Sequence, residues 1–411
     1  MLDEADARRE TNRLRAIVAV TALCDFVFGA TNVFVMLHAG IPAVSIGTAM
    51  AATVLVTRVV EAPTGALADR FGYRGVAFAG LALWGAGLIL FGTASGTAGF
   101  VLALLVWSAG MATYSGAPTA LVVNRLRGMG AQDLVARTLR SAQISRWVAA
   151  SAGAGIVAAG GHWLSAQAMI TAAGAVLLAV AVWMRAGWPV IRPVRSATAA
   201  ARFRAGLREI RRPQCAQLLW LSCVAAAAMS LLIMAWQPIT VQYVDFSVPA
   251  LGIALLFMTL GSALGAWAAR TPRGADAEPY AAAAAAALLL ALELVGHGRV
   301  ATAAGLVIAE FMIGMTGVFL SIRSHKVIPD DLRNTMSSLF STASGVSMGV
   351  ADLAFGHLWH AYGPAGGLHV GERFLLGLLG AYGVVKAVRL LRVGQGRTAR
   401  EPLPTDGIRK E

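Results

Sequence analysis

The chain has 411 residues, of which 57% are hydrophobic and only 13% are charged, and its 34 Lys and Arg against 21 Asp and Glu give a net charge of +13. A soluble globular protein is about 25% charged and 45–50% apolar, so this composition excludes a soluble enzyme and a disordered basic tail. Nucleic-acid binding needs basic side chains clustered on a solvated face, whereas the charges here occur in short runs between long apolar stretches. The composition therefore predicts a protein embedded in a lipid bilayer, with no nucleic acid as a partner.

The apolar stretches are long enough to cross a bilayer as helices. About 20 mostly apolar helical residues span the roughly 30 Å of hydrocarbon, and lipid offers no partner for free backbone groups. Twelve stretches meet this requirement and predict an all-α membrane protein of twelve transmembrane helices. The predicted spans are residues 15–38, 43–67, 74–95, 98–124, 138–160, 165–185, 215–241, 248–269, 280–297, 299–322, 335–358 and 372–391.

Basic residues are concentrated at alternate junctions between these spans, and the other junctions hold only Arg299 and Arg373. Basic loops stay in the cytoplasm, so both termini are predicted to be cytoplasmic. The first apolar run is longer than the core of a secretory signal, and we expect it to be a retained span. Arginine far outnumbers lysine and alanine is abundant, a composition associated with GC-rich bacterial genomes. We therefore expect a multi-pass protein of the bacterial cytoplasmic membrane.

The longest polar stretch divides the spans six and six, which predicts two pseudo-symmetric six-helix bundles. The predicted organisation is an N-terminal bundle at 1–185, a basic cytoplasmic linker at 186–213, a C-terminal bundle at 214–391 and a cytoplasmic tail at 392–411. Related halves joined by a linker are typical of a transporter that alternates access to a central site.

Within the linker, Phe203, Leu207 and Ile210 recur at helical spacing among arginines. This pattern predicts an amphipathic helix on the inner leaflet, with a solvated linker as the alternative. The halves also echo each other in sequence, because GALADR at 65–70 aligns with GAWAAR at 265–270.

Residues 61–74 read EAPTGALADRFGYR. This segment resembles the signature between helices 2 and 3 of the major facilitator superfamily, and Ile328-Pro329 leading to Arg333 resembles a segment of its drug-exporter-like members. The resemblance covers nearly the whole chain and implies a conformational latch formed by Gly65, Asp69, Arg70, Gly72 and Arg74. In physical terms the two glycines allow a tight reversal, and the carboxylate can accept hydrogen bonds from helix-end amides. A capped turn without a latch function is the alternative.

Several charges lie inside the predicted spans, where an ionisable group is expensive and is a functional candidate by default. Asp25 and Glu310 lie near the middle of the first and tenth spans, and Arg146 lies in the inner half of the fifth. Arg58 and Glu61 are spaced i, i+3 on the second span and can neutralise each other. A buried carboxylate near a movable cation can bind and release a proton as its surroundings change. We expect these five residues to act in proton coupling or substrate binding; the alternative is permanent structural pairing, favoured for Arg58 and Glu61.

The sequence indicates neither catalysis nor a cofactor. It contains no nucleophile–base grouping and no phosphate-binding loop, so we expect no enzyme activity. His357-x-x-His360 has a spacing that two metal ligands could use, but a third ligand is missing, and we interpret both histidines as interfacial. Glu293 and Asp352 lie toward the outer ends of their spans and are likewise expected at the interface.

The exporter-like segment and the few polar residues in most spans favour a monomeric secondary transporter that exports a drug-like or amphipathic metabolite in exchange for protons. Two features differ from proton-coupled drug exporters of the superfamily: LLVWSAGMATYSGA in the fourth span carries no basic residue, and the fifth span lacks a Gly-Pro pair. The alternatives are an uptake symporter for a polar metabolite and a non-transporting membrane scaffold or receptor.

Overall fold

The computed structural model describes residues 4–188, 199–271, 276–329 and 333–398, and every regular element in these ranges is a helix. The N-terminal half contains α1 (Glu4–Gly29), α2 (Asn32–His38), α3 (Ala43–Phe71), α4 (Tyr73–Thr93), α5 (Gly96–Tyr114), α6 (Ala117–Gly128), α7 (Asp133–Gly160) and α8 (Ala166–Gly187). The C-terminal half contains α9 (Ala199–Ile210), α10 (Pro213–Tyr243), α11 (Val248–Ala268), α12 (Glu278–Leu292), α13 (Arg299–Val327) and α14 (Arg333–Thr398).

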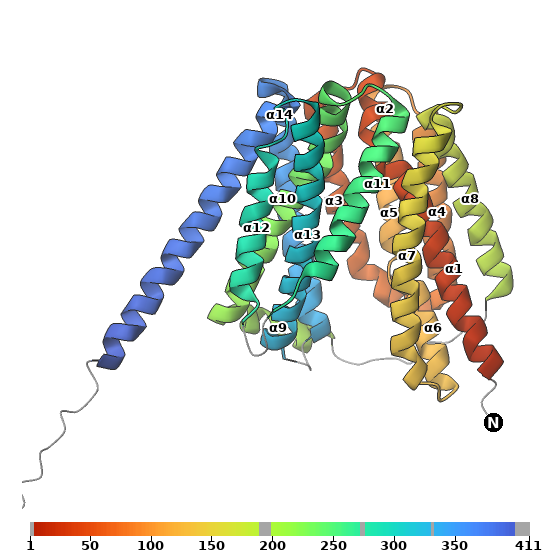
Figure 1. Ribbon diagram of the computed structural model, residues 1–411. Coiled ribbons are helices and arrows are strands. Elements are labelled where there is room, and N and C mark those ends of the chain that lie inside the picture. Colours follow the sequence, from red (N-terminus) through yellow and green to blue (C-terminus); the bar gives the residue numbers. More distant parts are fainter. Residues whose placement is uncertain (1–3, 189–198, 272–275, 330–332, 399–411) are drawn as a thin grey trace, which may run out of the picture.

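Together these helices form twelve crossings of the bundle, as predicted. Nine helical stretches in the described residues are long and apolar enough to cross a membrane, and one of them, Thr335–Ala387, contains two crossings. This stretch breaks at Gly363 (φ 75°, ψ 170°), after which Pro364 begins a second arm of α14 that turns back along the bundle (Figure 1). The charged α7 and the 15-residue α12 supply the remaining two crossings.

Two crossings that were predicted as continuous helices are each broken into a pair of helices. The first is interrupted at Ala30 and Thr31, between α1 and α2, and the fourth at Ser115 and Gly116, between α5 and α6. Gly116 has φ +75°, a left-handed conformation that favours glycine. A non-helical backbone at membrane depth is tolerated only where protein or a cavity surrounds it. Each break lies beside one of the two adjoining cavities described below.

The chain also continues as helix beyond two predicted boundaries. Helix α1 begins at Glu4, eleven residues before the predicted span at 15–38. The second arm of α14 runs to Thr398, so the predicted boundary between bundle and tail at 391/392 falls inside a helix. Helix α9 lies in the predicted linker and packs against α10 and α14, with Ile210 next to an apolar cluster that includes Cys215 and Phe340. The side chain of Phe203 is outside the described set.

The two halves approach each other at one end and diverge at the other (Figure 1). The helix pairs α3–α14, α7–α11 and α2–α10 join them. We call the end that carries α2 and the start of α11 the closed end, and the end that carries the start of α1, α6 and α9 the basic end. Glycines allow the closest approach near the closed end, because a Cβ on Gly252 would lie 2.2 Å from the backbone nitrogen of Ala158, and one on Gly47 2.8 Å from the Cα of Gly356.

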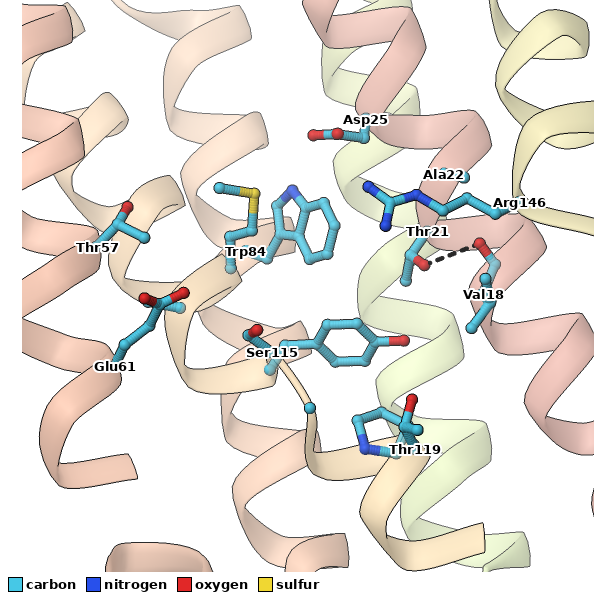
Figure 2. Close-up of a pocket in the computed structure, with 15 residues that line it drawn as sticks. Val18, Thr21, Ala22, Asp25, Thr57, Glu61, Trp84, Ser115, Thr119 and Arg146 are labelled. Atoms are coloured by element: carbon cyan, nitrogen blue, oxygen red, sulfur yellow. Dashed lines mark hydrogen bonds between the residues drawn. The ribbon is translucent and has the colours of Figure 1, made fainter. Parts of the chain in front are cut away.

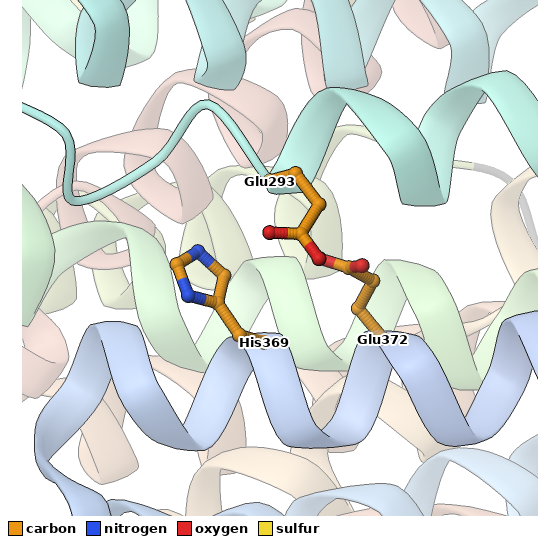
Figure 3. Close-up of side chains that lie close together, drawn as sticks. All are labelled: Glu293, His369 and Glu372. Carbon is orange, nitrogen blue, oxygen red and sulfur yellow. The ribbon is translucent and has the colours of Figure 1, made fainter.

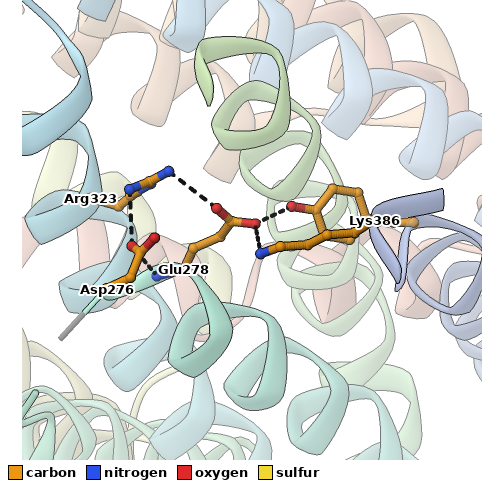
Figure 4. Close-up of polar contacts among 5 residues, drawn as sticks. Asp276, Glu278, Arg323 and Lys386 are labelled. Carbon is orange, nitrogen blue, oxygen red and sulfur yellow. Dashed lines mark hydrogen bonds and ion pairs between the residues drawn. The ribbon is translucent and has the colours of Figure 1, made fainter. Parts of the chain in front are cut away.

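A buried glutamate ties helices together at the basic end of each half. Glu10 is 1% exposed and pairs with Arg13 (2.6 Å) and, across from α1 to α6, with Arg125 (3.1 Å). Glu278, at the start of α12, pairs with Arg323 of α13 and with the second arm of α14 (Figure 4). These links hold each bundle together as a unit.

Candidate functional site

A cavity of about 550 Å³ lies between the two halves, within the range typical of small-molecule sites. Helices α1, α3, α5 and α7 line it from the N-terminal half, and α10, α11, α13 and α14 line it from the C-terminal half. A second cavity of about 300 Å³ lies inside the N-terminal half (Figure 2). The two share Asp25, Thr57, Met111 and Arg146 in their walls and so adjoin.

All five charged residues singled out from the sequence line these cavities. Asp25 and Arg146 line both, Arg58 and Glu310 line the central cavity, and Glu61 lines the smaller one. They come from α1, α3, α7 and α13, so the tertiary fold gathers groups up to 285 residues apart (310 minus 25). The intramembrane charges therefore face a shared space between the helices.

Asp25 and Arg146 form the centre of this group. Figure 2 shows the guanidinium group of Arg146 beside the carboxyl group of Asp25, where it attracts the carboxylate. Glu310 approaches the cavity from α13 of the other half and interacts with the hydroxyl of Ser262 on α11. The cavity thus contains a carboxyl–guanidinium pair on one side and a carboxyl group hydrogen-bonded to a neutral hydroxyl on the other.

Arg58 forms one hydrogen bond within its own helix and another to the other half of the molecule. Its Nη1 donates to Glu61 Oε2 at 2.8 Å and to Oγ of Ser341 on α14 at 2.8 Å. Gly345 leaves room for this side chain, because a Cβ there would lie 2.2 Å from Arg58 Nε. The two side chains are paired in this conformation, and the bond to Ser341 also links α3 to α14.

Asp352 is a cavity residue, and the expectation that it lies at the interface was wrong. It is 4% exposed, lines the central cavity and accepts a hydrogen bond from Ser230 on α10. The sequence contained a signal for this position: Asp352 follows Gly345 and Gly349 at helical spacing, on the glycine face that packs against α3. Glu293, in contrast, is about one-third exposed at the end of α12, as expected.

Gln237 is a second cavity residue that was not among the site residues predicted from the sequence. Its Nε2 donates to Asn32 Oδ1 at 2.7 Å and to the carbonyl of Gly29 at 2.8 Å, and its Oε1 accepts from the N–H of Phe34 at 2.8 Å. These bonds cross from α10 to the break between α1 and α2, whose backbone groups would otherwise lack partners. Gln237 thereby closes the cavity on the side of the closed end.

The apolar part of the central cavity is unusually rich in methionine and tryptophan. Its lining residues of these two types are Met50, Met111, Met229, Met234, Met258, Met348, Trp107, Trp147 and Trp236. Methionine adapts its shape to irregular partners and is over-represented at promiscuous surfaces. Such walls suit ligands with a substantial apolar part.

The predicted latch is described only in part. Helix α3 ends at Phe71, Gly72 has φ +84° and α4 begins at Tyr73, so a glycine occurs where the chain needs a left-handed residue. Arg74 donates to the carbonyl of Trp188 at the end of α8 at 2.7 Å, a contact within the N-terminal half. Gly65, Asp69 and Arg70 lie on α3, and the side chains of Asp69 and Arg70 are outside the described set.

One group of side chains in the described ranges has metal-ligand composition and spacing. The ligand atoms of Glu293, His369 and Glu372 all lie within 4.8 Å of one another, at the closed end of the C-terminal half and away from the cavity. His357 and His360, whose spacing was noted in the sequence, are exposed and do not belong to this group.

Comparisons with known proteins agree with this architecture. No curated protein matches the sequence significantly. A nucleoside transporter, NupG, superposes with a TM-score of 0.74 at 15% identity over 91% of this chain and 98% of its own. A bacterial homologue of the human lysosomal transporter Spinster, in an inward-facing unoccupied conformation, superposes with a TM-score of 0.69 at 13% identity over 97% of this chain and 99% of its own. A POT family transporter superposes with a TM-score of 0.71 at 12% identity over 92% and 96%.

These identities are low, and the likenesses establish the transporter fold alone. The sequence itself carries the family assignment, because residues 16–351 match the profile of the Major Facilitator Superfamily. With twelve crossings in two halves around a central cavity, and with a matched segment that covers most of both halves, this chain belongs to the Major Facilitator Superfamily.

Proposed function

We propose that this protein is a monomeric secondary transporter that exports a drug-like or amphipathic metabolite across the bacterial cytoplasmic membrane in exchange for protons. The observation that carries the proposal is the central cavity, in which Asp25, Arg146 and Glu310 face apolar walls of methionine and tryptophan. In this proposal the basic end faces the cytoplasm, as the distribution of arginines predicts. The divergence of the halves at that end then makes this an inward-facing conformation.

Alternating access follows from how the halves are joined. Gln237 and Arg58 each hydrogen-bond across the interface between the halves. Rocking of one half against the other exchanges these contacts for new ones at the basic end and opens the closed end. The latch segment, with Gly65, Asp69, Arg70, Gly72 and Arg74, stabilises the conformation in which the basic end is shut.

Proton coupling uses the carboxyl groups in the cavity. Asp25 lies beside the guanidinium group of Arg146 in this conformation. As the halves rock, the cavity around this pair opens and closes, and the change in solvation of the carboxylate alters its affinity for a proton. A substrate that enters the cavity competes for the same groups, which couples its exit to proton entry.

The test uses inside-out membrane vesicles in which respiration acidifies the lumen and a fluorescent amine reports the pH difference. A transported compound that is added outside should enter as protons leave, so that the lumen becomes more alkaline and the fluorescence recovers. Asp25→Asn and Glu310→Gln should abolish this recovery with normal amounts of protein in the membrane. The matched control is Asp133→Asn, an exposed carboxylate at the start of α7, which should transport normally.

The other outcomes distinguish the alternatives. Full activity in both amide variants would refute the assignment of the coupling residues. Substrate transport without proton movement would indicate a uniporter. Proton movement in the same direction as the substrate would indicate an uptake symporter. The remaining alternative is a membrane scaffold or receptor. It would be favoured if none of a range of tested compounds were transported and if the phenotype of a deletion strain were still complemented by Asp69→Ala and Asp25→Asn.

A further inference from the structure

The unexplained feature outside the cavity is the carboxyl group of Glu372, near the start of the second arm of α14. The residue is 0% exposed, and neither of its carboxylate oxygens accepts a hydrogen bond from an N–H or hydroxyl donor among the described residues. Its carboxyl group points at that of Glu293, at the end of α12 (Figure 3). Two carboxyl groups in contact repel each other when both are ionised, so something must neutralise the pair.

The carboxyl group of Glu293 already pairs with a guanidinium group. The side chain of Arg373 donates to it twice, at 2.8 Å from Nε and 3.3 Å from Nη2. The remaining choice is therefore whether Glu372 donates a proton to Glu293 or whether both carboxylates share a cation.

His369 lies one turn before Glu372 on the same helix and favours a cation. One ring nitrogen belongs to the set of ligand atoms that lie within 4.8 Å of one another, and Nε2 lies 2.9 Å from the carbonyl of Val295, which fixes the ring beside the acids. The ring of His297 stacks on that of His369, with ring centroids 5.7 Å apart. Together with the two carboxyl groups, the imidazole completes a three-residue ligand set.

From this arrangement we propose that Glu293, His369 and Glu372 bind one divalent transition-metal ion, of the Zn²⁺ or Mn²⁺ type, at the closed end of the C-terminal half. Two carboxylates and one imidazole are ligands that these ions accept, whereas Ca²⁺ and Mg²⁺ prefer oxygen alone. Water fills the remaining coordination positions. The ion has an entry path, because the side chain of Glu293 is 34% exposed and that of Arg373 is 65% exposed and able to swing away.

The site joins the end of α12 to the second arm of α14. These helices also meet at the basic end, through the ion pair of Glu278 and Lys386. A bound ion would clamp the same two helices at the opposite end and stabilise the C-terminal half as a rigid body. The site is separate from the central cavity, so ion binding and transport can be tested independently.

The test is calorimetric titration of ZnCl2 into the purified full-length protein in detergent, without a polyhistidine tag. The expected result is one ion per chain, with affinity at least tenfold lower in Glu372→Gln and His369→Ala and with much weaker binding of Ca²⁺. Arg373→Gln removes the competing cation from Glu293 and should raise the zinc affinity severalfold. The matched controls are Asp245→Asn and His162→Ala, an exposed acid and an exposed histidine outside the site, which should leave the affinity unchanged.

Where Glu372→Gln does not yield folded protein, Glu293→Gln at the exposed edge of the site replaces it. Zinc affinity that is unchanged in the site variants, or calcium binding as tight as zinc, would overturn the proposal. Absence of zinc binding to the unmodified protein would overturn it as well, and the two carboxyl groups would then share a proton.

Discussion

The side chain of Gln237 in the C-terminal half donates a 2.7 Å hydrogen bond to Oδ1 of Asn32 in the N-terminal half. The two residues are 205 positions apart, and their contact lies where the first crossing is broken. A polar side chain of one half thus satisfies the backbone of the other at the closed end.

Gln237→Leu is expected to open the closed end. The substitution removes three hydrogen bonds and leaves buried groups at Gly29 and Phe34 without partners, at a cost of about 1–3 kcal/mol. Conformations with the closed end open should become roughly 5- to 150-fold more populated. Spin labels are attached at Trp163→Cys and Asp245→Cys in a background without the native cysteines. The distance between the two labels should be longer in Gln237→Leu than in the protein that retains Gln237. Gln242→Leu, an exposed position on the same helix, is the control and should leave the distance distribution unchanged.

Gly252→Ala is expected to prevent the halves from meeting near the closed end. A Cβ at this position would lie 2.2 Å from the nitrogen of Ala158, a backbone atom that cannot move aside on its own. Overpacking of this kind typically costs about 1–3 kcal/mol, here only in the conformation in which the halves touch. Transport in vesicles should fall at least tenfold at normal expression. Gly155→Ala, on α7 with no atom within 4 Å of the added Cβ, should transport normally; a similar loss in both variants would show that the close approach is not the cause.

Glu278→Gln is expected to destabilise the C-terminal half. Glu278 is 2% exposed and pairs with Arg323 at 3.2 Å and Lys386 at 2.5 Å (Figure 4). Removal of one partner from a buried ion pair costs about 3–5 kcal/mol, so the apparent melting temperature in detergent should drop strongly. Asp276→Asn is the comparison, because Asp276 also pairs with Arg323 but is 46% exposed, and exposed pairs contribute about 0–1 kcal/mol. Equal shifts in the two variants would contradict this account.

Asp352→Leu is expected to cost more stability than Asp352→Asn. The amide retains an acceptor for the hydroxyl of Ser230, whereas leucine removes the acceptor that α14 offers to α10. Loss of a buried hydrogen-bond partner costs about 1–3 kcal/mol. The melting temperature, measured by thermal unfolding, should be lower for Asp352→Leu than for Asp352→Asn. A melting temperature that is the same in both would show that the Ser230 contact does not stabilise this crossing.

The architecture could be predicted from local sequence because it depends on local properties. The length of each apolar stretch predicts a crossing, and the twelve helical crossings are confirmed. The echo of GALADR at 65–70 in GAWAAR at 265–270 indicated two related halves, which the fold and the family assignment bear out. The residues of the candidate site were chosen because charge inside an apolar stretch is rare, and Asp25, Arg146 and Glu310 do line one cavity.

The faces of the helices could not be predicted in the same way. A crossing that is apolar on all sides carries no periodic signal for its rotation about its own axis. Asp352 was placed by depth alone, and wrongly, because the glycine face marked by Gly345 and Gly349 gains its meaning only when α3 packs against it. Gln237 was overlooked because its partners, the free backbone groups of the first crossing, exist only where that helix is broken. The pairing of Glu293 with Glu372 likewise depends on the return of α14 past the end of α12.

The sequence by itself determined the membrane-embedded class, the number of crossings and the division into two halves, because apolar length and charge are properties of each segment alone. Only the tertiary structure decided where the first and fourth crossings break, which charges share a cavity and which acids meet at the closed end. Those features arise from contacts between helices far apart in the chain, and each helix takes its rotation from the neighbours against which it packs.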